Sequence, residues 1–559
     1  MAAFFKKDIS TRTYHLTCLI LVLIKLWLVR AHMVMVTLTP HDDLLFINHA
    51  DSLLSGNWLG EFNQMTLIKE PFYPMFIALS NLLSLPLLFA EHLFYALACW
   101  LFVWAVGPLV RQRIVLLAAF VFLLLNPGSY NYPAIGRIFQ LAIYAPLALI
   151  VMSLLLGMAI RATAPWRTAI GWSCGLGLGL AVFWITRGES IFLMPSVALI
   201  FLFIFVATCG RKPRTWVRPL LLCLLPLVCM FGAVQLIKHK NNIHYGVPSV
   251  IELTTPEFEA AYGGMLRIIS DEDRQFYPVV RLARLKAYAV SPTFRQIEKY
   301  LDGPVGEKWI NLVGDNDIPA AFFIWAFRDS LAAAGFYSSG SEVLDFYRKM
   351  GEELDSACLS GELRCRPRLT SLVPPWRPEY NALIIPTVFS VMQKTLRFDG
   401  FNAHTDHFKS AVPKETMVLF SNVTGERMLS SQRGGHDVYR EYVTHLNREK
   451  CRILDQIGHA YQLFTPPFFI LALLLFLYTF AVAVKKRRLP LMTVFSMASL
   501  AGISGITAVM TLLAITSYSE IARVMHVSFP LVLLFIISVF FDILGANTSL
   551  IKPPKNLNN

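Results

Sequence analysis

Two adjacent carboxylates, Asp42 and Asp43, follow directly on the first long apolar segment of the chain, in the sequence Pro40-His41-Asp42-Asp43. A carboxylate within hydrogen-bond reach of a hydroxyl or amine can remove its proton as that group attacks. We expect Asp42 to be this general base. Asp43 would orient it, hold a substrate hydroxyl, or raise its pKa through like-charge proximity. The alternative for one of the two is a plain helix N-cap with a neighbour favoured by the helix dipole.

Long apolar segments surround this pair and make up most of the chain. Of the 559 residues, 55% are hydrophobic and only 16% are charged, and the mean hydropathy is +0.52. This composition predicts a polytopic α-helical membrane protein with about 10–11 spans. The first span follows basic residues without a small-residue cleavage site, so we expect it to be a retained signal anchor.

Residues 238–462 differ from the rest of the chain in being polar and electrically neutral, with 27 basic and 27 acidic residues. The segment is too long to be a connector. We therefore predict three parts. They are an N-terminal transmembrane block (1–237) with a catalytic first outer loop (37–70), a soluble and mostly helical outer-face domain (238–462), and a C-terminal transmembrane block with a short cytoplasmic tail (463–559).

The net charge of +13 belongs to the membrane blocks, where most basic residues lie in short clusters such as 111–113 and 485–488. The positive-inside rule places these clusters in the cytoplasm, and the first loop and the 238–462 domain on the outer face. Nucleic-acid binding is not expected, because the basic residues are divided among short loops. The stretch 71–126 must contain a segment that is non-spanning, re-entrant or an exception to the charge rule, since Asp42 outside and Arg111 inside require an odd number of crossings.

Four further basic residues lie at the predicted outer ends of apolar segments, where the positive-inside rule disfavours them: Arg187, Lys69, Arg523 and Arg137. Charges in such places usually have a function. We expect these four to bind an anion at the membrane surface, with a lipid phosphate the first candidate. The alternative is interfacial snorkelling, or pairing with nearby carboxylates such as Glu189 and Glu520.

Three short motifs, taken in their order along the chain, resemble the GT-C membrane glycosyltransferases. Within this class, the motifs resemble those of the dolichyl-phosphate-mannose protein mannosyltransferases and of the bacterial aminoarabinose transferase that modifies lipid A. The motifs are the acidic pair after the first span, Lys69-Glu70-Pro71-Phe72-Tyr73-Pro74 before the next one, and Thr186-Arg187-Gly188-Glu189. The last helices, with Ser519-Glu520 and Arg523, match more loosely.

This resemblance implies transfer of a sugar from a polyprenyl-phosphate-linked donor to a glycan, lipid or protein acceptor on the outer face, usually with inversion. It implies Asp42 as the catalytic carboxylate, and a bacterial inner membrane with a periplasmic active site as the location. Consistently, the sequence has no Gly-rich nucleotide-binding fingerprint. The best-known relatives have Asp-Glu where this chain has Asp-Asp, which leaves the role of Asp43 open. A multi-span lipid or sugar transporter without transferase activity is the alternative, although no internal repeat is visible.

No cofactor is certain from the sequence, and a divalent metal is left open. His41 adjoins the acidic pair, but three consecutive side chains diverge, so an ion would need a ligand from elsewhere. The group His404, Asp406 and His407 is a weak ligand set and stays unassigned.

Cys358 and Cys365 flank a Ser-Gly turn in the outer domain, where an oxidising compartment would allow a disulfide. A zinc site is the alternative for these two cysteines, and it would need two more ligands.

Overall fold

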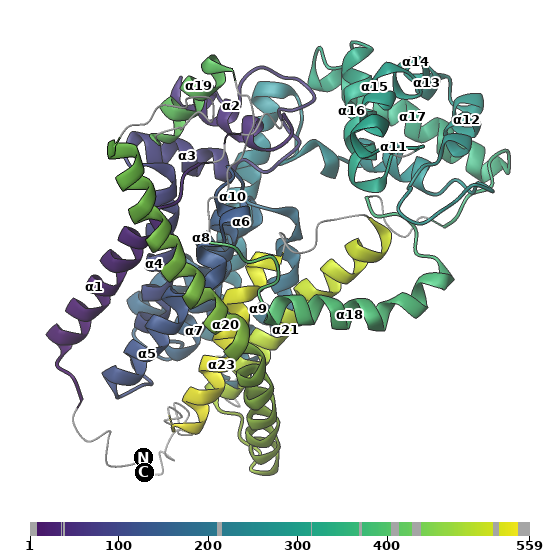
Figure 1. The fold of residues 1–559 in the computed structure, drawn as a ribbon. Helices are drawn as coiled ribbons and strands as arrows, with labels where there is room; N and C mark the ends of the chain where they lie inside the picture. Colours follow the sequence, from purple (N-terminus) through teal and green to yellow (C-terminus); the bar gives the residue numbers. More distant parts are fainter. Residues whose placement is uncertain are drawn as a thin grey trace.

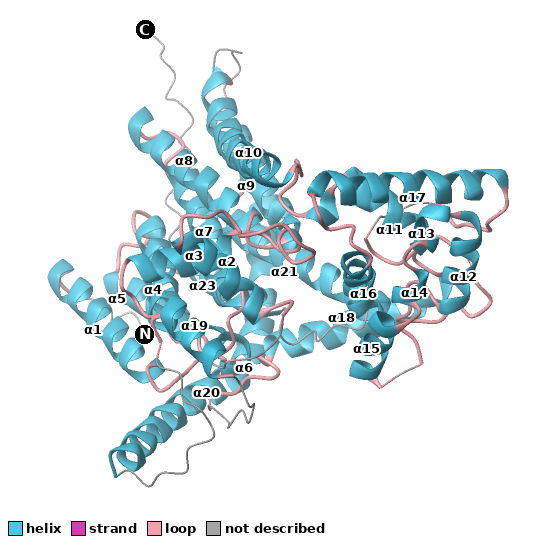
Figure 2. Ribbon diagram, turned by 90° about the horizontal axis from the view of Figure 1, so that it is seen from above, coloured by secondary structure: helices cyan, strands magenta, loops and turns pink. Residues whose placement is uncertain are grey.

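The computed structural model describes residues 8–34, 36, 40–209, 215–314, 316–367, 372–403, 413–426, 438–517 and 525–545. Figures 1 and 2 show a long helical bundle with a smaller helical domain at one end. Within these ranges the backbone forms helices and one isolated bridge, between Ile268 and Cys365, but no strand.

Eight helical segments are long and apolar enough to cross a membrane, and a ninth is added if a pair bent by 54° is one span. The bent pair joins α5 (Arg113–Leu124) to the segment Pro127–Ile135. The eight are α1 (Thr11–Val29), α4 (Leu87–Val106), α7 (Leu141–Ile160), η2 with α9 (Gly188–Thr208), α10 (Val217–Tyr245), the His445–Lys485 part of α20 (Val438–Lys485), α21 (Leu491–Thr516), and η6 with α23 (Met525–Ile543). The predicted polytopic helical class is confirmed, with fewer such helices in the described residues than the 10–11 expected.

The apolar stretch after the first outer loop shows why the span count is lower. It forms one short helix, α3 (Phe72–Leu82), and one long enough to cross, α4. Ser84, with a φ of 55°, and Pro86 break the chain between them. Since α3 has only 11 residues, about 16 Å of helix, it is too short to span. The non-spanning segment required by the charge pattern is therefore α3.

Another helix, α8 (Trp166–Trp184), is long enough to cross but is not among the eight apolar ones. It packs between α7 and α10. Gly177 makes the close approach to α10 possible, since a Cβ there would lie 2.5 Å from the Cβ of Cys229. Small residues at such contacts are typical of packed membrane helices.

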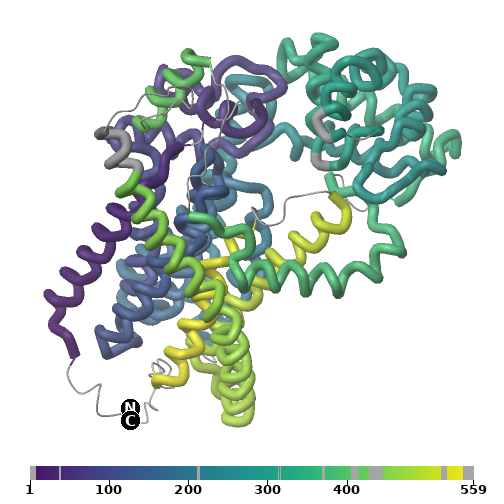
Figure 3. Tube along the Cα trace, in the orientation of Figure 1, coloured from purple at the N-terminus to yellow at the C-terminus, as the bar shows by residue number. Residues whose placement is uncertain are grey.

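The polar segment predicted as one domain divides in the structure. Its own hydrophobic core is formed by residues 258–363, in the seven helices from α11 (Pro256–Leu266) to α17 (Gly340–Ser360). We call this part the outer domain, after the face of the membrane on which the sequence predicts it to lie. Two later helices, α18 (Asn381–Leu396) and α19 (Lys414–Thr424), pack instead on the bundle, against α21 and α3 respectively. Figure 3 shows that the chain enters through α10 and returns through α20, so residues 238 and 462 both lie inside long helices.

The first outer loop is fixed by hydrogen bonds to the end of α10 and to the segment that leads from α10 into the outer domain. Trp58 Nε1 donates to Asn241 Oδ1 at 2.7 Å, and the Tyr245 hydroxyl donates to the Gly60 carbonyl at 2.9 Å. The Glu252 amide donates to the Leu67 carbonyl at 2.7 Å. The Glu252 side chain in turn accepts from Arg328 of α16 (Ala320–Ala333) in a fully buried ion pair. These contacts position α16 beside the loop that carries the acidic pair.

Candidate active site

The acidic pair stands at the start of α2 (Asp43–Leu54), the short helix of the first outer loop. Asp42 occupies the N-cap position, but its side chain makes no capping hydrogen bond, so the N-cap alternative is wrong for this residue. Asp43 is fully buried, whereas the Asp42 side chain is 27% exposed. The two carboxylates therefore have different environments, and Asp42 is the one that a substrate can reach.

Arg137 joins both carboxylates from the turn between α6 (Tyr132–Ile135) and α7. Its Nε donates to Asp43 Oδ2 at 3.1 Å, and its Nη2 donates to Asp42 Oδ2 at 3.3 Å and to Asp43. The backbone amide of Ile138 donates to Asp43 Oδ1 at 3.1 Å. Both oxygens of Asp43 are thus occupied by one short segment, which gives this residue a positioning role.

Lys69 forms an ion pair with the other oxygen of Asp42. Burial alone would raise the pKa of Asp42, but the charges of Lys69 and Arg137 outweigh it and hold the pKa below its ordinary value. Whatever Asp43 adds, the net pKa of Asp42 is lowered, because the paired cations dominate. Asp42 is ionised at neutral pH, as a base must be, and its basicity is restrained as long as Lys69 is in contact.

Three of the predicted anion-binding cations converge on one aromatic ring, that of Phe139. The distances to the ring centroid are 5.0 Å for Lys69 Nζ, 5.8 Å for Arg137 Cζ and 5.9 Å for Arg187 Cζ. Each lies within the range of a cation–π contact. The ring therefore brings three positive charges together, and two of them, Lys69 and Arg137, contact Asp42.

Arg187 is held by Glu189, with Nε donating to Oε2 at 3.0 Å and Nη2 donating to Oε1 at 2.8 Å. Its Nη1 is buried and has no hydrogen-bond partner among the described residues. A buried guanidinium N–H without a partner costs free energy, and an anionic ligand would satisfy it. Glu189 is thus paired with Arg187 as the sequence alternative predicted, and Arg187 Nη1 is not used by this pair.

Glu70 lies beside this pair and was not singled out by the sequence analysis, although it is the second residue of the Lys69-Glu70-Pro71 motif. It is buried, and an oxygen lies 3.3 Å from the position that a Cβ on Gly188 would occupy. Burial, and then the negative charge of Glu189, raise the pKa of Glu70 to about 7. The site therefore contains a carboxyl that changes charge near neutral pH.

The outer domain reaches the site through His41 and two tryptophans. The His41 ring lies 4.3 Å from the ring of Trp325 and 5.0 Å from that of Trp309, centroid to centroid, and its Nε2 is 3.6 Å from Asp329 Oδ2. Trp325 is also 6.0 Å from Lys69 Nζ. His41 thus connects the first outer loop to the outer domain. Neither tryptophan nor Phe139 had a sequence signal, because only the fold brings them to the acidic pair.

Two predicted site residues, Glu520 and Arg523, lie outside the described residues, as do His404, Asp406 and His407. Of the predicted cations, Lys69 and Arg137 contact Asp42, and Arg187 joins them at the ring of Phe139. In the outer domain, Cys358 and Cys365 form a disulfide with a Cα–Cα distance of 5.6 Å.

A divalent metal does not fit the acidic pair as it is arranged. Lys69 and Arg137 contact the carboxylate oxygens that would have to be ligands. In the part of the chain that the structure describes, no three His, Cys, Asp or Glu side chains are grouped closely enough to hold an ion. We therefore derive no step through a metal.

Comparison with known proteins gives distant structural likenesses. No family model and no curated protein matches the sequence. The structure is similar to that of ArnT from Cupriavidus metallidurans bound to undecaprenyl phosphate, with 13% identity and a TM-score of 0.31 over 95% of this chain and 78% of the other. It is also similar to an oligosaccharyltransferase from Archaeoglobus fulgidus, with 12% identity and a TM-score of 0.38 over 94% of this chain and 51% of the other.

A second structure of the Archaeoglobus fulgidus enzyme, named AglB and solved with an inhibitory peptide and a dolichol-phosphate, has 13% identity and a TM-score of 0.31. It matches over 89% of this chain and 56% of the other. These proteins are GT-C membrane glycosyltransferases, the class that the sequence motifs resemble. A likeness this distant says nothing by itself about donor, acceptor or catalytic base.

Proposed function

We propose that this chain is a membrane glycosyltransferase that moves a sugar from a polyprenyl-phosphate-linked donor to a glycan, lipid or protein acceptor on the outer face of the membrane. The observation that carries the proposal is the arrangement of Asp42, Lys69, Arg137 and Arg187. A partly exposed, ionised carboxylate is in contact with two cations, and a third cation, Arg187, lies at the same Phe139 ring with an unused buried N–H. A base beside an anion site is what displacement of a phosphate by a hydroxyl requires.

In the proposed reaction, the acceptor oxygen or nitrogen attacks the anomeric carbon while the bond from that carbon to the phosphate oxygen breaks. The bonding electrons leave with the phosphate, and Asp42 takes the acceptor proton. Attack from the face opposite to the leaving group inverts the configuration. Lys69 and Arg187 stabilise the charge that develops on the polyprenyl phosphate, so the leaving group needs no proton. Asp43 and Arg137 hold Asp42 in place.

Donor binding would also activate the base. Lys69 is paired with Asp42 when no donor is present, which lowers the pKa of that carboxyl. The donor phosphate offers Lys69 a second anionic partner, and its negative charge grows as the bond to the anomeric carbon breaks. As Lys69 turns toward the phosphate, Asp42 loses its closest cation and its pKa rises toward the ordinary range. Proton removal would then depend on the donor being in place.

The experiment that tests this function measures transfer of radiolabelled sugar from a native lipid extract to cell-envelope acceptors by the purified full chain. Wild-type protein should transfer label and Asp42→Asn should not. Asp51→Asn is the matched control, because Asp51 lies on the same helix with an exposed side chain. Transfer by all three proteins would remove Asp42 from catalysis. Lipid binding without transfer by any of them would favour the transporter alternative.

A further inference from the structure

We infer that Trp325 of the outer domain binds the sugar ring of the donor by stacking against it, with His41 at the edge of the same subsite. The inference rests on the proposed function and deepens it, because it concerns the same site. It divides the donor between two parts of the chain. The cations of the bundle and of the first outer loop bind the phosphate, and the outer domain binds the sugar.

The indole of Trp325 presents its face to Lys69. The ammonium nitrogen of Lys69 lies over this ring, 6.0 Å from the centroid. That distance is the outer limit of a cation–π contact, so the ring contributes little to holding the ammonium. The rings of Phe46 and Phe139 are closer to the same nitrogen, at 5.0 Å each, and Asp42 pairs with it directly. The face of Trp325 is therefore not needed to hold Lys69 in place.

Trp325 also differs from the second tryptophan beside His41. Trp309 is 6% exposed, and its Nε1 donates to Asp329 Oδ2 at 3.1 Å, so it belongs to the core of the outer domain. Trp325 is only partly buried and packs against that core from outside. Ligand pockets are lined mainly by apolar and aromatic side chains with a few placed polar groups. A partly exposed indole that faces a charged site is suited to this use.

His41 supplies a polar atom next to this indole. Its ring is 4.3 Å from that of Trp325, centroid to centroid, and the two planes meet at 73°. The Nε2 atom of His41 is buried and has no hydrogen-bond partner among the described residues, since Asp329 Oδ2 at 3.6 Å is too far for a hydrogen bond. A buried polar atom without a partner costs free energy. A sugar hydroxyl can donate to this nitrogen or accept from it, depending on the tautomer.

The order of groups in the proposed reaction places the sugar in this subsite. The phosphate binds to Lys69 and Arg187 while the acceptor proton goes to Asp42, so the anomeric carbon lies between these groups. The rest of the sugar ring extends from that carbon to a neighbouring surface. Trp325 faces Lys69 and therefore borders this space. His41 borders it as well, because it directly precedes Asp42 in the chain.

The indole face also indicates the kind of sugar. The face of an aromatic ring carries partial negative charge, and it attracts the weakly positive C–H groups on one side of a sugar ring. A pyranose whose hydroxyls lie mostly in the plane of its ring exposes several such C–H groups together. The subsite therefore favours a pyranose of this type over a sugar with hydroxyls on both faces.

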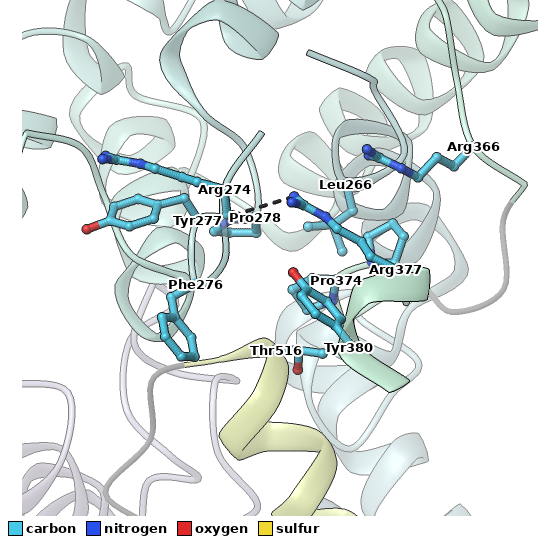
Figure 4. A pocket seen from close by; sticks show the side chains of 11 residues that line it. Leu266, Arg274, Phe276, Tyr277, Pro278, Arg366, Pro374, Arg377, Tyr380 and Thr516 are labelled. Carbon is cyan, nitrogen blue, oxygen red and sulfur yellow. Dashed lines mark hydrogen bonds between the residues drawn. The ribbon is translucent and has the colours of Figure 1, made fainter. Parts of the chain in front are cut away.

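The hollow between the outer domain and the outer end of α21 is not an alternative sugar site. Figure 4 shows it lined by Arg377, Tyr380 and Thr516, among other residues. It has room for about one water molecule, which is much smaller than a sugar ring. Trp376 precedes Arg377 in the chain and is partly exposed, and its indole donates to Asn381 Oδ1 at 2.9 Å. This tryptophan therefore provides a matched control outside the candidate active site.

The test measures how well the purified full chain retains two lipids. One is the radiolabelled donor from a native lipid extract, and the other is polyprenyl phosphate of the same chain length without a sugar. Trp325→Leu should lower retention of the donor by about tenfold and leave retention of polyprenyl phosphate as in the wild type. Trp325→Phe keeps an aromatic face and should lower donor retention by only about threefold. Trp376→Leu should retain both lipids as the wild type does.

The outcomes distinguish this inference from the proposed function. Equal donor retention by the wild type and Trp325→Leu would overturn the inference and leave the transferase function standing. Equal loss of both lipids in Trp325→Leu would also contradict it, because the indole would then support the phosphate site or the fold. An effect confined to the acceptor KM would assign Trp325 to the acceptor instead. Retention of neither lipid by the wild type would remove the proposed function, and the sugar subsite with it.

Discussion

Arg137 and Asp43 form the most complete contact of the candidate active site. The guanidinium donates to both oxygens of the buried carboxylate, and the next residue, Ile138, adds its backbone amide. Arg137 also contacts Asp42. The position of the exposed carboxylate is therefore fixed through its buried neighbour.

Asp43→Asn should destabilise the protein more than it changes the chemistry. Removing one partner of a buried ion pair costs about 3 kcal/mol, because the other charge remains without its partner. We expect a clearly lower melting temperature of the detergent-purified protein, with transfer falling in proportion to the folded fraction. Asp51→Asn should melt like the wild type. A stable Asp43→Asn protein that binds donor but transfers nothing would contradict the positioning role and make Asp43 a catalytic group.

Arg187→Lys should weaken donor binding while keeping the positive charge. Lysine cannot make the two-point contact with Glu189 and also offer a separate N–H to a phosphate. Loss of one charge-assisted hydrogen bond costs about 1.5 kcal/mol, so the donor KM should rise about tenfold. Steady-state kinetics with donor as the varied substrate measure this, with the exposed Arg295→Lys as control. An unchanged donor KM would exclude Arg187 from the phosphate site.

The stability of the protein should fall as the pH rises from about 4.5 to 7, in part because of Glu70. Burial and Glu189 raise its pKa to about 7 from the ordinary value of 4.5 that it has in the unfolded chain. The folded state thus binds more protons than the unfolded state between these pH values, and stability decreases with pH there. The span corresponds to about 3 kcal/mol. Glu70→Gln should reduce this slope in melting curves recorded from pH 4.5 to 8, and parallel curves for the two proteins would contradict the assignment.

Reduction of the disulfide should destabilise the outer domain. The Cys358–Cys365 bond closes a short loop, and the chain-entropy relation gives about 2.5 kcal/mol for a loop of this size. We expect a reducing agent to lower the melting temperature of the wild type and to leave the double variant Cys358→Ser, Cys365→Ser unchanged. An equal response of both proteins to the reductant would show that the effect lies elsewhere.

Hydropathy and charge predicted the helical class and the grouping of Lys69, Arg137 and Arg187 near the acidic pair. They also showed that one segment after the first loop is irregular, but they did not identify that segment. The length of α3 is decided by the break in the chain from Ser84 to Pro86, which hydropathy does not reveal. Glu70 belongs to the motif Lys69-Glu70-Pro71, but nothing in the sequence indicates that its side chain is buried beside Glu189. Phe139, Trp309 and Trp325 could not be found, because their proximity to Asp42 comes from long-range packing that leaves no local pattern.

The polar segment 238–462 shows the same limit. Its composition predicted a soluble helical domain, and residues 258–363 have a core of their own. The positions of α18 and α19 depend on surfaces of α21 and α3 that composition does not describe.

The measurement that tests the central claim most directly is a single-turnover assay on Asp42→Asn with radiolabelled polyprenyl-phosphate-linked sugar already bound. Donor retention and transfer are measured in the same sample, with Asp51→Asn in parallel. The asparagine keeps the size of Asp42 but cannot take a proton. If Asp42 is the base, donor retention should stay within a few-fold of wild type and the transfer rate should fall by at least a hundredfold. Transfer at the wild-type rate by Asp42→Asn would contradict the account.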